Sequence, residues 1–384
     1  MISLDDLYVQ VQEQYKLNWI AGKKGGVHPV GWVHLVEDPK IIQFLWSNDL
    51  ALTLGVGFQS EQALMDCIIR LVQRNCVGLI INTGEYINEI PESIIHYCDQ
   101  HNFPLLTLPW EIHVNLFIKD ISIRCQQATI NDEKIASYFI KGFKNEEKLD
   151  QYREELSEYF DVNNDFQITV IDVLKKDETE IQKQKIQARL RFYFGNINCK
   201  YLFFWYEDHL ILITNSLPLP NLYSMCEKMI HVSKSKLGNL PIRIGIGSSL
   251  HDLKSTAKNY KRAKAALEYA HRFEQELAIF SNIGFYQILF SVEDKEILND
   301  YYHECLNPLI EYDKKHHSQL ELTFEYYLKY NGAISIIAQE LFTHRNTINY
   351  RIQKIKTLLD SDLDDSQELF KYSLAYMVKD KEEE

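Results

Sequence analysis

Apolar residues in the first third of the chain form short runs separated by segments with helical spacing. The short runs predict strands at residues 30–36, 50–55, 77–82 and 104–108. The segments with helical spacing predict helices at residues 60–74 and 91–101. Ser3 stands three residues before Asp6 ahead of a further apolar helical pattern, which predicts a capped opening helix. Strands that alternate with helices in this way indicate a sheet with parallel strands and helices on its faces.

The middle of the chain changes pattern twice. Between residues 111 and 160 it becomes helical and more charged, which predicts a helical connector. The next block predicts a strand at 166–173, a helix at 178–194, a hairpin at 201–214 turning at Glu207-Asp208, a helix at 221–236, a strand at 242–247 and a helix at 253–272. That order of elements matches a ferredoxin-like split βαβ sheet.

From residue 283 onward the strand patterns largely disappear, and helical spacing dominates. The sequence therefore predicts a multidomain α/β + α protein. Its predicted parts are an N-terminal α/β domain at residues 1–125, a helical connector at 126–160, a central ferredoxin-like α+β domain at 161–282, and an all-α region at 283–384 with its core at 320–378.

Composition and charge restrict the partners that the whole chain can have. At roughly 150 residues per domain, 384 residues suffice for two or three domains. The formal net charge of −13 argues against affinity of the whole chain for nucleic acid or for an anionic membrane. A site for a polyanion must therefore be local.

Cysteine content and the chain termini bear on the cellular compartment. The 7 cysteines are odd in number and include no C-x-x-C pair, which predicts neither a disulfide framework nor a cysteine zinc site. The N-terminus lacks a basic region followed by an apolar run, and no stretch approaches the ~18 apolar residues of a spanning helix. We expect a cytoplasmic protein with no membrane partner.

The most informative pattern lies at residues 334–358, which predict two helices joined by a tight corner at Phe342-Thr343. In the second helix one apolar stripe is formed by Ile348, Ile352, Ile355 and Leu359. Residues at these spacings share one face of a helix, so the stripe should be buried and the other face exposed. Thr343 is placed to cap the second helix.

The exposed face of that second helix carries Arg345, Asn346 and Asn349 on its first turns. A recognition helix meets base edges there, and Arg and Asn are suited to guanine and adenine. Residues 331–358 contain four bases and one acid, so this segment is basic within an acidic chain. An ordinary αα-hairpin with a solvated polar face has the same pattern, so spacing alone leaves DNA binding open.

Longer motifs favour DNA binding over an ordinary αα-hairpin. The segment His344-Arg-Asn-Thr-Ile-Asn-Tyr-Arg-Ile-Gln-Lys-Ile, preceded by Ala338-Gln-Glu-Leu-Phe, resembles the C-terminal helix-turn-helix of the PucR family of bacterial transcription regulators. The resemblance implies a DNA-binding surface made by Thr343, His344, Arg345, Asn346, Thr347, Asn349, Tyr350, Arg351 and Lys354.

The rest of the chain supports the same resemblance. Val30-Gly-Trp-Val-His-Leu, Asp49-Leu-Ala-Leu-Thr-Leu-Gly and Pro104-Leu-Leu-Thr-Leu-Pro-Trp are similar to that family's sensor domain, and the middle block resembles its degenerate GGDEF-like domain. The resemblance implies a cytoplasmic regulator, usually of purine or amino-acid catabolic genes. Its implied partners are operator DNA and a small-molecule effector.

The middle block has an alternative interpretation as a nucleotide cyclase, since active GGDEF enzymes share its strand order and resemble Ile242-Arg-Ile-Gly-Ile-Gly. Such enzymes carry a glycine-rich hairpin for phosphate and metal, where this chain has Trp205-Tyr-Glu-Asp-His. Bulky side chains replace the glycines that let backbone approach a triphosphate. Asp172 alone is too few carboxylates for a two-metal site. We expect no enzymatic activity, catalytic residue, metal site or cofactor.

Glycines and polar residues at the ends of the predicted N-terminal strands indicate where an effector would bind. Ligands of open α/β sheets commonly lie beyond the carboxyl ends of the strands. The candidates there are Thr53, Gly55, Asn82, Thr83 and Trp110. They suit a small polar heterocycle, such as a purine-degradation metabolite, or an amino acid.

Two further expectations concern assembly and the remaining alternative. A single recognition helix reads few bases, so a homodimer reading two half-sites is expected. The other alternative is an interaction adaptor that does not contact DNA. Affinity for DNA that rises as salt is lowered distinguishes a regulator from such an adaptor.

Overall fold

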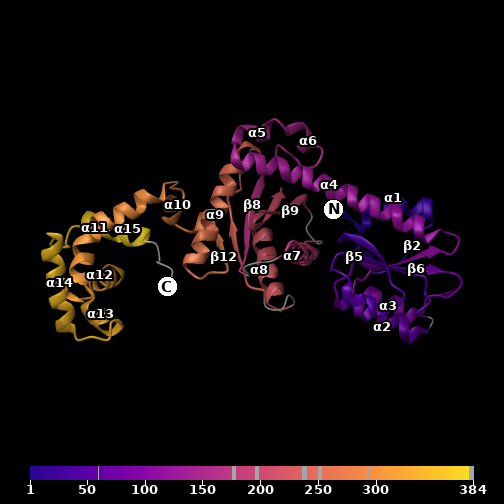
Figure 1. The fold of residues 1–384 in the computed structure, drawn as a ribbon, viewed down its shortest axis with the longest axis horizontal. Helices are drawn as coiled ribbons and strands as arrows, with labels where there is room; N and C mark the ends of the chain where they lie inside the picture. Colours follow the sequence, from indigo (N-terminus) through magenta and orange to yellow (C-terminus); the bar gives the residue numbers. More distant parts are fainter. Residues whose placement is uncertain are drawn as a thin grey trace. The chain divides into compact units, whose positions relative to one another are not determined.

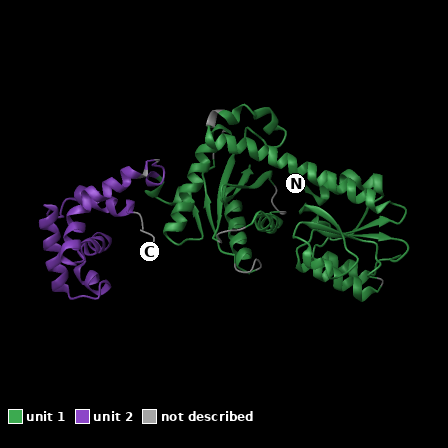
Figure 2. Ribbon diagram, viewed as in Figure 1, with its two compact units in different colours: residues 1–287 green, residues 288–384 purple. Residues whose placement is uncertain are grey.

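The computed structural model describes residues 1–58, 60–174, 179–194, 199–235, 240–249, 253–292 and 294–379, without the side chains of residues 146, 147 and 295. Two predicted helix ends, at residues 178 and 236, lie outside this range. The chain divides into two compact units, residues 1–287 and residues 288–384 (Figure 2).

The N-terminal part of the first unit is built on a five-stranded sheet in the order β2-β7-β6-β5-β4. Four of its strands are parallel: β4 (Trp32–Leu35), β5 (Asp49–Thr53), β6 (Gly78–Thr83) and β7 (Leu105–Pro109). These four strands were predicted from the sequence. The strand β2 (Asn18–Ala21), antiparallel to β7, was not predicted, because its apolar run is only three residues long. A small pair, β1 (Ile2–Ser3) with β3 (Pro29–Val30), completes the strands.

Helices cover both faces of this sheet, as the sequence predicted (Figure 1). On one face lie α2 (Glu61–Gln73) and α3 (Glu92–Gln100), which bury Leu64, Ile68 and Ile94 against the strands. On the other face lie α1 (Leu4–Tyr15) and the first half of α4 (Val114–Lys144). The Ser3 side chain caps α1 by accepting a hydrogen bond from the Asp6 N–H at 3.1 Å, as predicted.

The segment predicted as a helical connector is helical, and its apolar side chains are buried in two hydrophobic cores. The helix α4 runs without interruption across residue 125, where the sequence suggested a boundary. Its second half, with α5 (Glu146–Asp150) and α6 (Arg153–Ser157), packs on the central sheet. The buried side chains there include Phe139, Phe143, Leu149 and Leu156. Apolar residues that are buried in this way belong to the central core.

The central sheet has the order β12-β11-β8-β10-β9. Its strands are β8 (Phe166–Val173), β9 (Tyr201–Tyr206), β10 (His209–Asn215), β11 (Ile242–Ile246) and β12 (Leu277–Ile279). Among the first four strands, each neighbouring pair is antiparallel, which is the predicted ferredoxin-like arrangement. The edge strand β12 pairs with β11 in parallel. One face carries α7 (Glu180–Phe192) and α8 (Leu219–Ser235), and the other carries α9 (Thr256–Arg272).

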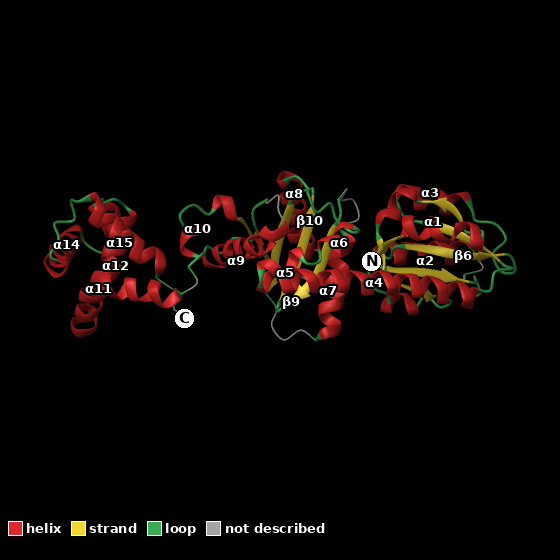
Figure 3. Ribbon diagram, turned by 90° about the horizontal axis from the view of Figure 1, so that it is seen from above, coloured by secondary structure: helices red, strands yellow, loops and turns green. Residues whose placement is uncertain are grey.

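The second unit is helical throughout its described residues (Figure 3). Its helices are α11 (Lys295–His316), α12 (Leu320–Lys329), α13 (Ile334–Glu340), α14 (Arg345–Leu359) and α15 (Ser366–Val378). The short α10 (Tyr286–Leu289) lies where the two units join in sequence. None of the helices in the described ranges combines the length and the apolar character needed to cross a bilayer.

Candidate nucleic-acid interface and ligand sites

The corner between α13 and α14 is a tight helix C-cap. The Thr343 N–H donates to the Ala338 carbonyl at 2.9 Å, and the Phe342 N–H donates to the Gln339 carbonyl at 3.2 Å. This pair of bonds is the Schellman motif, which needs a left-handed residue at the position of Phe342. Phe342 has φ of +48° and is 97 % exposed. The predicted corner at Phe342-Thr343 is therefore confirmed.

The first turn of α14 corrects one prediction. Thr343 was expected to cap the helix, but the N-cap residue is His344. The His344 Nδ1 accepts a hydrogen bond from the Asn346 N–H at 3.2 Å. The prediction was wrong because the Schellman bonds hold Thr343 as the last residue of the corner, so the helix begins one residue later.

The orientation of α14 is fixed by its apolar stripe. Ile348, Ile352 and Ile355 are at most 5 % exposed, and Leu359 is half-buried. Burying each such side chain is worth about 1.5–3 kcal/mol, so rotation of the helix about its axis is strongly disfavoured. The burial predicted for this stripe is confirmed.

The face opposite the stripe contains most of the predicted DNA-binding residues. Six of them are exposed: His344, Arg345, Asn346, Thr347, Asn349 and Tyr350. The first turn of α14 carries no acidic residue, and the positive end of the helix dipole there favours a nearby phosphate. The exposed residues combine one cation, three amide or hydroxyl side chains and two rings on about two turns of helix.

Two other predicted DNA-binding residues contact the rest of their own unit. The Arg351 guanidinium donates to Thr323 Oγ1 and to Gln319 Oε1, each at 3.1 Å. The Lys354 Nζ lies 4.9 Å from the centre of the Tyr312 ring. Both side chains are half-buried, so they hold α14 against α11 and α12. Arg351, Lys354 and the half-buried Thr343 are therefore the predicted DNA-binding residues that lie outside the exposed face.

The predicted effector residues meet at one edge of the N-terminal sheet. Because β5, β6 and β7 are parallel, Thr53, Thr83 and Trp110 all lie at or just beyond their carboxyl ends. The Trp110 ring packs edge-on against Tyr86, with ring centres 5.8 Å apart. A Cβ on Gly55 would lie 3.3 Å from the Tyr86 Cβ, so Gly55 borders the same cluster.

Two of these residues are buried and already have partners. The Thr53 hydroxyl donates to Glu37 Oε1 at 3.1 Å, and the Asn82 amide donates to the Leu108 and Pro109 carbonyls. Glu37 also accepts from the Leu54 and Val56 N–H groups. These N–H groups would otherwise attract an anion, so the Glu37 carboxylate makes this edge less suited to a negatively charged ligand. Glu37 was not among the predicted site residues, although it directly follows the predicted strand 30–36.

A cavity of about 630 Å³ elsewhere in the first unit was not predicted. Its lining includes Trp32, Trp46 and Trp205 from three separate parts of the chain. Asn48 and Arg191, which also line it, are buried, and Asn48 Oδ1 and Arg191 Nε have no hydrogen-bond partner. No sequence pattern signals this cavity, because its residues come together only in the folded unit.

The acidic residues that could serve cyclase chemistry are paired with basic side chains. The Asp172 carboxylate accepts from His271 Nε2 at 2.9 Å, and Arg243 Nη1 lies 2.9 Å from His271 Nδ1. Burial raises the pKa of Asp172, but the hydrogen bond and charge of His271, with smaller contributions from His209 and Arg243, lower it overall.

The hairpin turn itself is similarly paired. Glu207 lies 3.8 Å from Lys264, and Asp208 lies 3.4 Å from Lys183. The predicted turn at these two acids is confirmed by the pairing of Tyr206 with His209 across it. Within the described ranges, no cluster of three or more His, Cys, Asp or Glu side chains could hold a metal ion.

Three family models match the chain. Residues 9–123 match the purine catabolism regulatory protein-like family, abbreviated PucR. Residues 150–269 match the GGDEF-like domain, and residues 320–378 match the PucR C-terminal helix-turn-helix domain. The GGDEF-like match contains β8 to β11 of the central sheet, and the helix-turn-helix match contains α12 to α15.

Curated proteins of Bacillus subtilis (strain 168) are also similar. The chain is 33 % identical over 134 residues to a purine catabolism regulatory protein, which is 33 % of this chain and 25 % of that protein. It is 27 % identical over 132 residues to the DNA-binding transcriptional activator AdeR, covering 34 % of this chain and 31 % of AdeR. It is 33 % identical over 128 residues to the proline-responsive transcriptional activator PutR, covering 33 % of this chain and 31 % of PutR.

These matches thus span about a quarter to a third of the length of each relative. The three family models, in contrast, follow one another along this chain in the order that its motifs suggested. Along the chain, a match to the PucR N-terminal domain is thus followed by a match to the GGDEF-like domain and a match to the PucR C-terminal helix-turn-helix.

Proposed function

We propose that this protein is a ligand-responsive transcription regulator that binds operator DNA through α14. The observation that carries the proposal is the exposed polar face of α14, which begins directly after a tight helix-turn-helix corner. Arg345, Asn346 and Asn349 lie on this face, away from the buried isoleucines. Side chains of these types form paired hydrogen bonds with guanine and adenine in the major groove.

The regulated genes and the effector belong to the same proposal. Two of the similar proteins are named for purine catabolism and for a response to proline. We therefore propose a purine-degradation metabolite or an amino acid as the effector, and catabolic genes as the target. Since operator DNA is the proposed partner, the proposed location is the cytoplasm.

Replacing a base-reading side chain tests the role of α14. We expect Arg345→Ala and Asn349→Ala each to weaken binding to the preferred operator by ~1–3 kcal/mol, because each removes contacts to a base edge. The operator is first selected from random duplexes with the full chain. Binding of each variant is then titrated on that operator and on a scrambled duplex at several salt concentrations.

Lys315→Ala is the matched control, because Lys315 is an exposed cation of the same unit outside α14. It should leave the preference for the operator unchanged. Arg351→Ala should lower the thermal stability of the unit as well as DNA affinity, since its guanidinium bonds to Thr323 and Gln319. Equal losses on operator and scrambled DNA for Arg345→Ala and Asn349→Ala would refute base reading by α14.

We also propose that the protein acts as a homodimer through α4. Leu116, Ile123 and Ile130 follow one another at seven-residue intervals on this helix and are 61 %, 50 % and 51 % exposed. Apolar side chains at that interval form a seam that a second helix can cover. The seam lies within residues 111–160, the segment whose pattern predicted a helical connector.

A charge placed in the seam should separate the dimer. We expect Ile123→Lys to lower the mass measured by light scattering at micromolar concentration from dimer to monomer, because a buried unpaired charge opposes association. Val9→Lys, at an exposed apolar residue of α1, should leave the mass unchanged. A monomeric wild-type protein that binds a two-half-site operator undiminished would exclude this dimer.

The central domain is proposed to lack enzymatic activity. Asp172, Glu207 and Asp208 each pair with a basic side chain, and the hairpin has no glycine for close approach to a triphosphate. The full chain incubated with nucleoside triphosphates and Mg²⁺ or Mn²⁺ should form no cyclic product above the amount given by Asp172→Ala. Product that Asp172→Ala abolishes would show a cyclase.

The effector is proposed to bind at the carboxyl edge of the N-terminal sheet, at Thr53, Gly55, Asn82, Thr83 and Trp110. A ligand at one hundred times its dissociation constant stabilises the folded protein by ~2.7 kcal/mol. We would measure thermal unfolding of the full chain with purine-degradation intermediates and amino acids. Trp110→Ala should remove the shift that an active compound produces, because Trp110 supplies the exposed ring of this edge.

Trp32→Ala is the matched control, since Trp32 is a similarly exposed tryptophan at the amino end of β4. It should retain the full thermal shift. Loss of the shift in Trp32→Ala but not in Trp110→Ala would place the effector in the cavity lined by the three tryptophans. That result would contradict the proposed edge site.

A further inference from the structure

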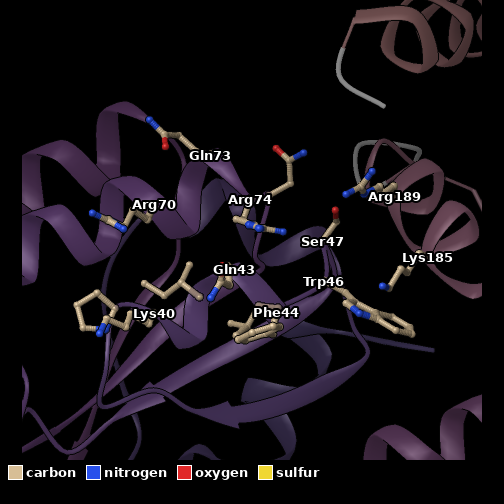
Figure 4. Close-up of a pocket in the computed structure, with 14 residues that line it drawn as sticks. Lys40, Gln43, Phe44, Trp46, Ser47, Arg70, Gln73, Arg74, Lys185 and Arg189 are labelled. Carbon is tan, nitrogen blue, oxygen red and sulfur yellow. The ribbon is translucent and has the colours of Figure 1, made fainter. Parts of the chain in front are cut away.

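A basic pocket lies at the amino end of the N-terminal sheet and has no role in the function proposed above (Figure 4). Its volume is about 710 Å³, within the range of about 300–1,000 Å³ typical of small-molecule sites. Its basic lining residues are Lys40, Arg70, Arg74, Lys185 and Arg189. The other residues that line it are polar or apolar, and none is acidic.

The charges of this basic pocket are unusual for this protein. The chain carries a net charge of −13, yet no described carboxylate forms an ion pair with any of the five cations. Arg70 and Arg74 are four residues apart around the C-terminus of α2, and Lys185 and Arg189 are four residues apart on α7. Like charges at that spacing repel one another, so both pairs weaken their helices unless an anion lies between them.

The dipole of α2 accounts for only part of this arrangement. A helix C-terminus favours cations, which explains Arg70 and Arg74 without a ligand. It does not explain Lys40, which precedes the short helix at Ile41–Phe44, or the pair on the middle of α7. Three separate elements therefore direct cations to one cavity.

The neutral residues of the pocket add two kinds of contact. Gln43, Gln73 and Asn75 provide amide groups for hydrogen bonds. Phe44 is 71 % exposed beside the half-buried Trp46, so the wall offers aromatic surface to a planar group. The Lys185 ammonium lies 5.8 Å from the centre of the Trp46 ring, which brings the cationic and aromatic parts together.

We propose that this basic pocket binds a nucleotide, with its phosphates on the arginines and lysines and its base on Phe44 and Trp46. Arginine and lysine are the side chains that bind phosphate oxygens most strongly, and several of them match a multiply charged group. None of the hairpin residues 205–209 lines the pocket, so the site differs from a cyclase active site.

A nucleotide in this pocket would bridge two domains. Lys40, Arg70 and Arg74 belong to the N-terminal domain, whereas Lys185 and Arg189 belong to α7 of the central domain. The same two surfaces meet where the His28 and Phe192 rings stack 4.0 Å apart and where Asn75 donates to the Tyr193 hydroxyl at 3.3 Å. The ligand would therefore strengthen an existing contact between the domains.

The test is a titration of the full chain with ATP, GTP, pyrophosphate and inorganic phosphate. Binding is measured by calorimetry and by tryptophan fluorescence. At least one nucleotide should bind saturably and more tightly than pyrophosphate, with a fluorescence change that Trp46→Phe reduces. Arg74→Gln and Lys185→Gln should each weaken binding about tenfold or more. Lys228→Gln, an exposed lysine on α8 of the same unit, should bind as the wild type does.

Three outcomes would overturn the proposal. One is no saturable binding of any nucleotide by wild-type protein that unfolds cooperatively. Another is equal weakening by Lys185→Gln and Lys228→Gln, which would indicate a general charge effect. A third is loss of binding to scrambled duplex DNA in Arg74→Gln and Lys185→Gln with nucleotide binding unchanged, which would make the pocket a DNA contact instead.

Discussion

The structure of the first unit depends on one helix that is buried in two cores. The first half of α4 places Phe117, Ile121 and Cys125 under the N-terminal sheet, and its second half places Phe139 and Phe143 under the central sheet. A helix of 31 residues is about 46 Å long, and neither half can turn about the axis without exposing apolar side chains. A change at the N-terminal sheet that moves α4 must therefore also move side chains of the central core. The N-terminal and central sheets are therefore coupled through one continuous helix.

In the second unit, burial of apolar side chains fixes the orientation of α14. The isoleucine stripe of α14 determines which polar residues face outward, and the bonds of Arg351 and the contact of Lys354 keep the helix against its neighbours. The outward face can then be varied without affecting the packing. This separation explains why a helix-turn-helix can change its DNA target while it keeps its fold.

Much of this architecture could be predicted from the sequence, because it depends on local patterns. The four parallel strands, the hairpin turn at Glu207-Asp208 and the stripe on α14 follow from the spacing of apolar and turn residues. The failures are of another kind. Edge strand β2 has an apolar run of only three residues, and the cap moved from Thr343 to His344 through backbone bonds. Pairing of β2 with β7 joins residues far apart in the sequence, and the cap is set by the backbone bonds of the corner, so neither follows from a pattern of apolar positions.

The ligand sites show this limit most clearly. The carboxyl edge of the sheet could be predicted from topology, but the Glu37 carboxylate that occupies its N–H groups could not, because it comes from the loop after a neighbouring strand. The basic pocket had a partial sequence signal in the like-charged pairs of α2 and α7, yet those pairs are more than 100 residues apart. While the basic pocket is empty, its unpaired cations repel one another. A bound anion would remove that repulsion. Repulsion of this kind raises the free energy of the empty site, so part of the affinity for an anion comes from relief of that repulsion.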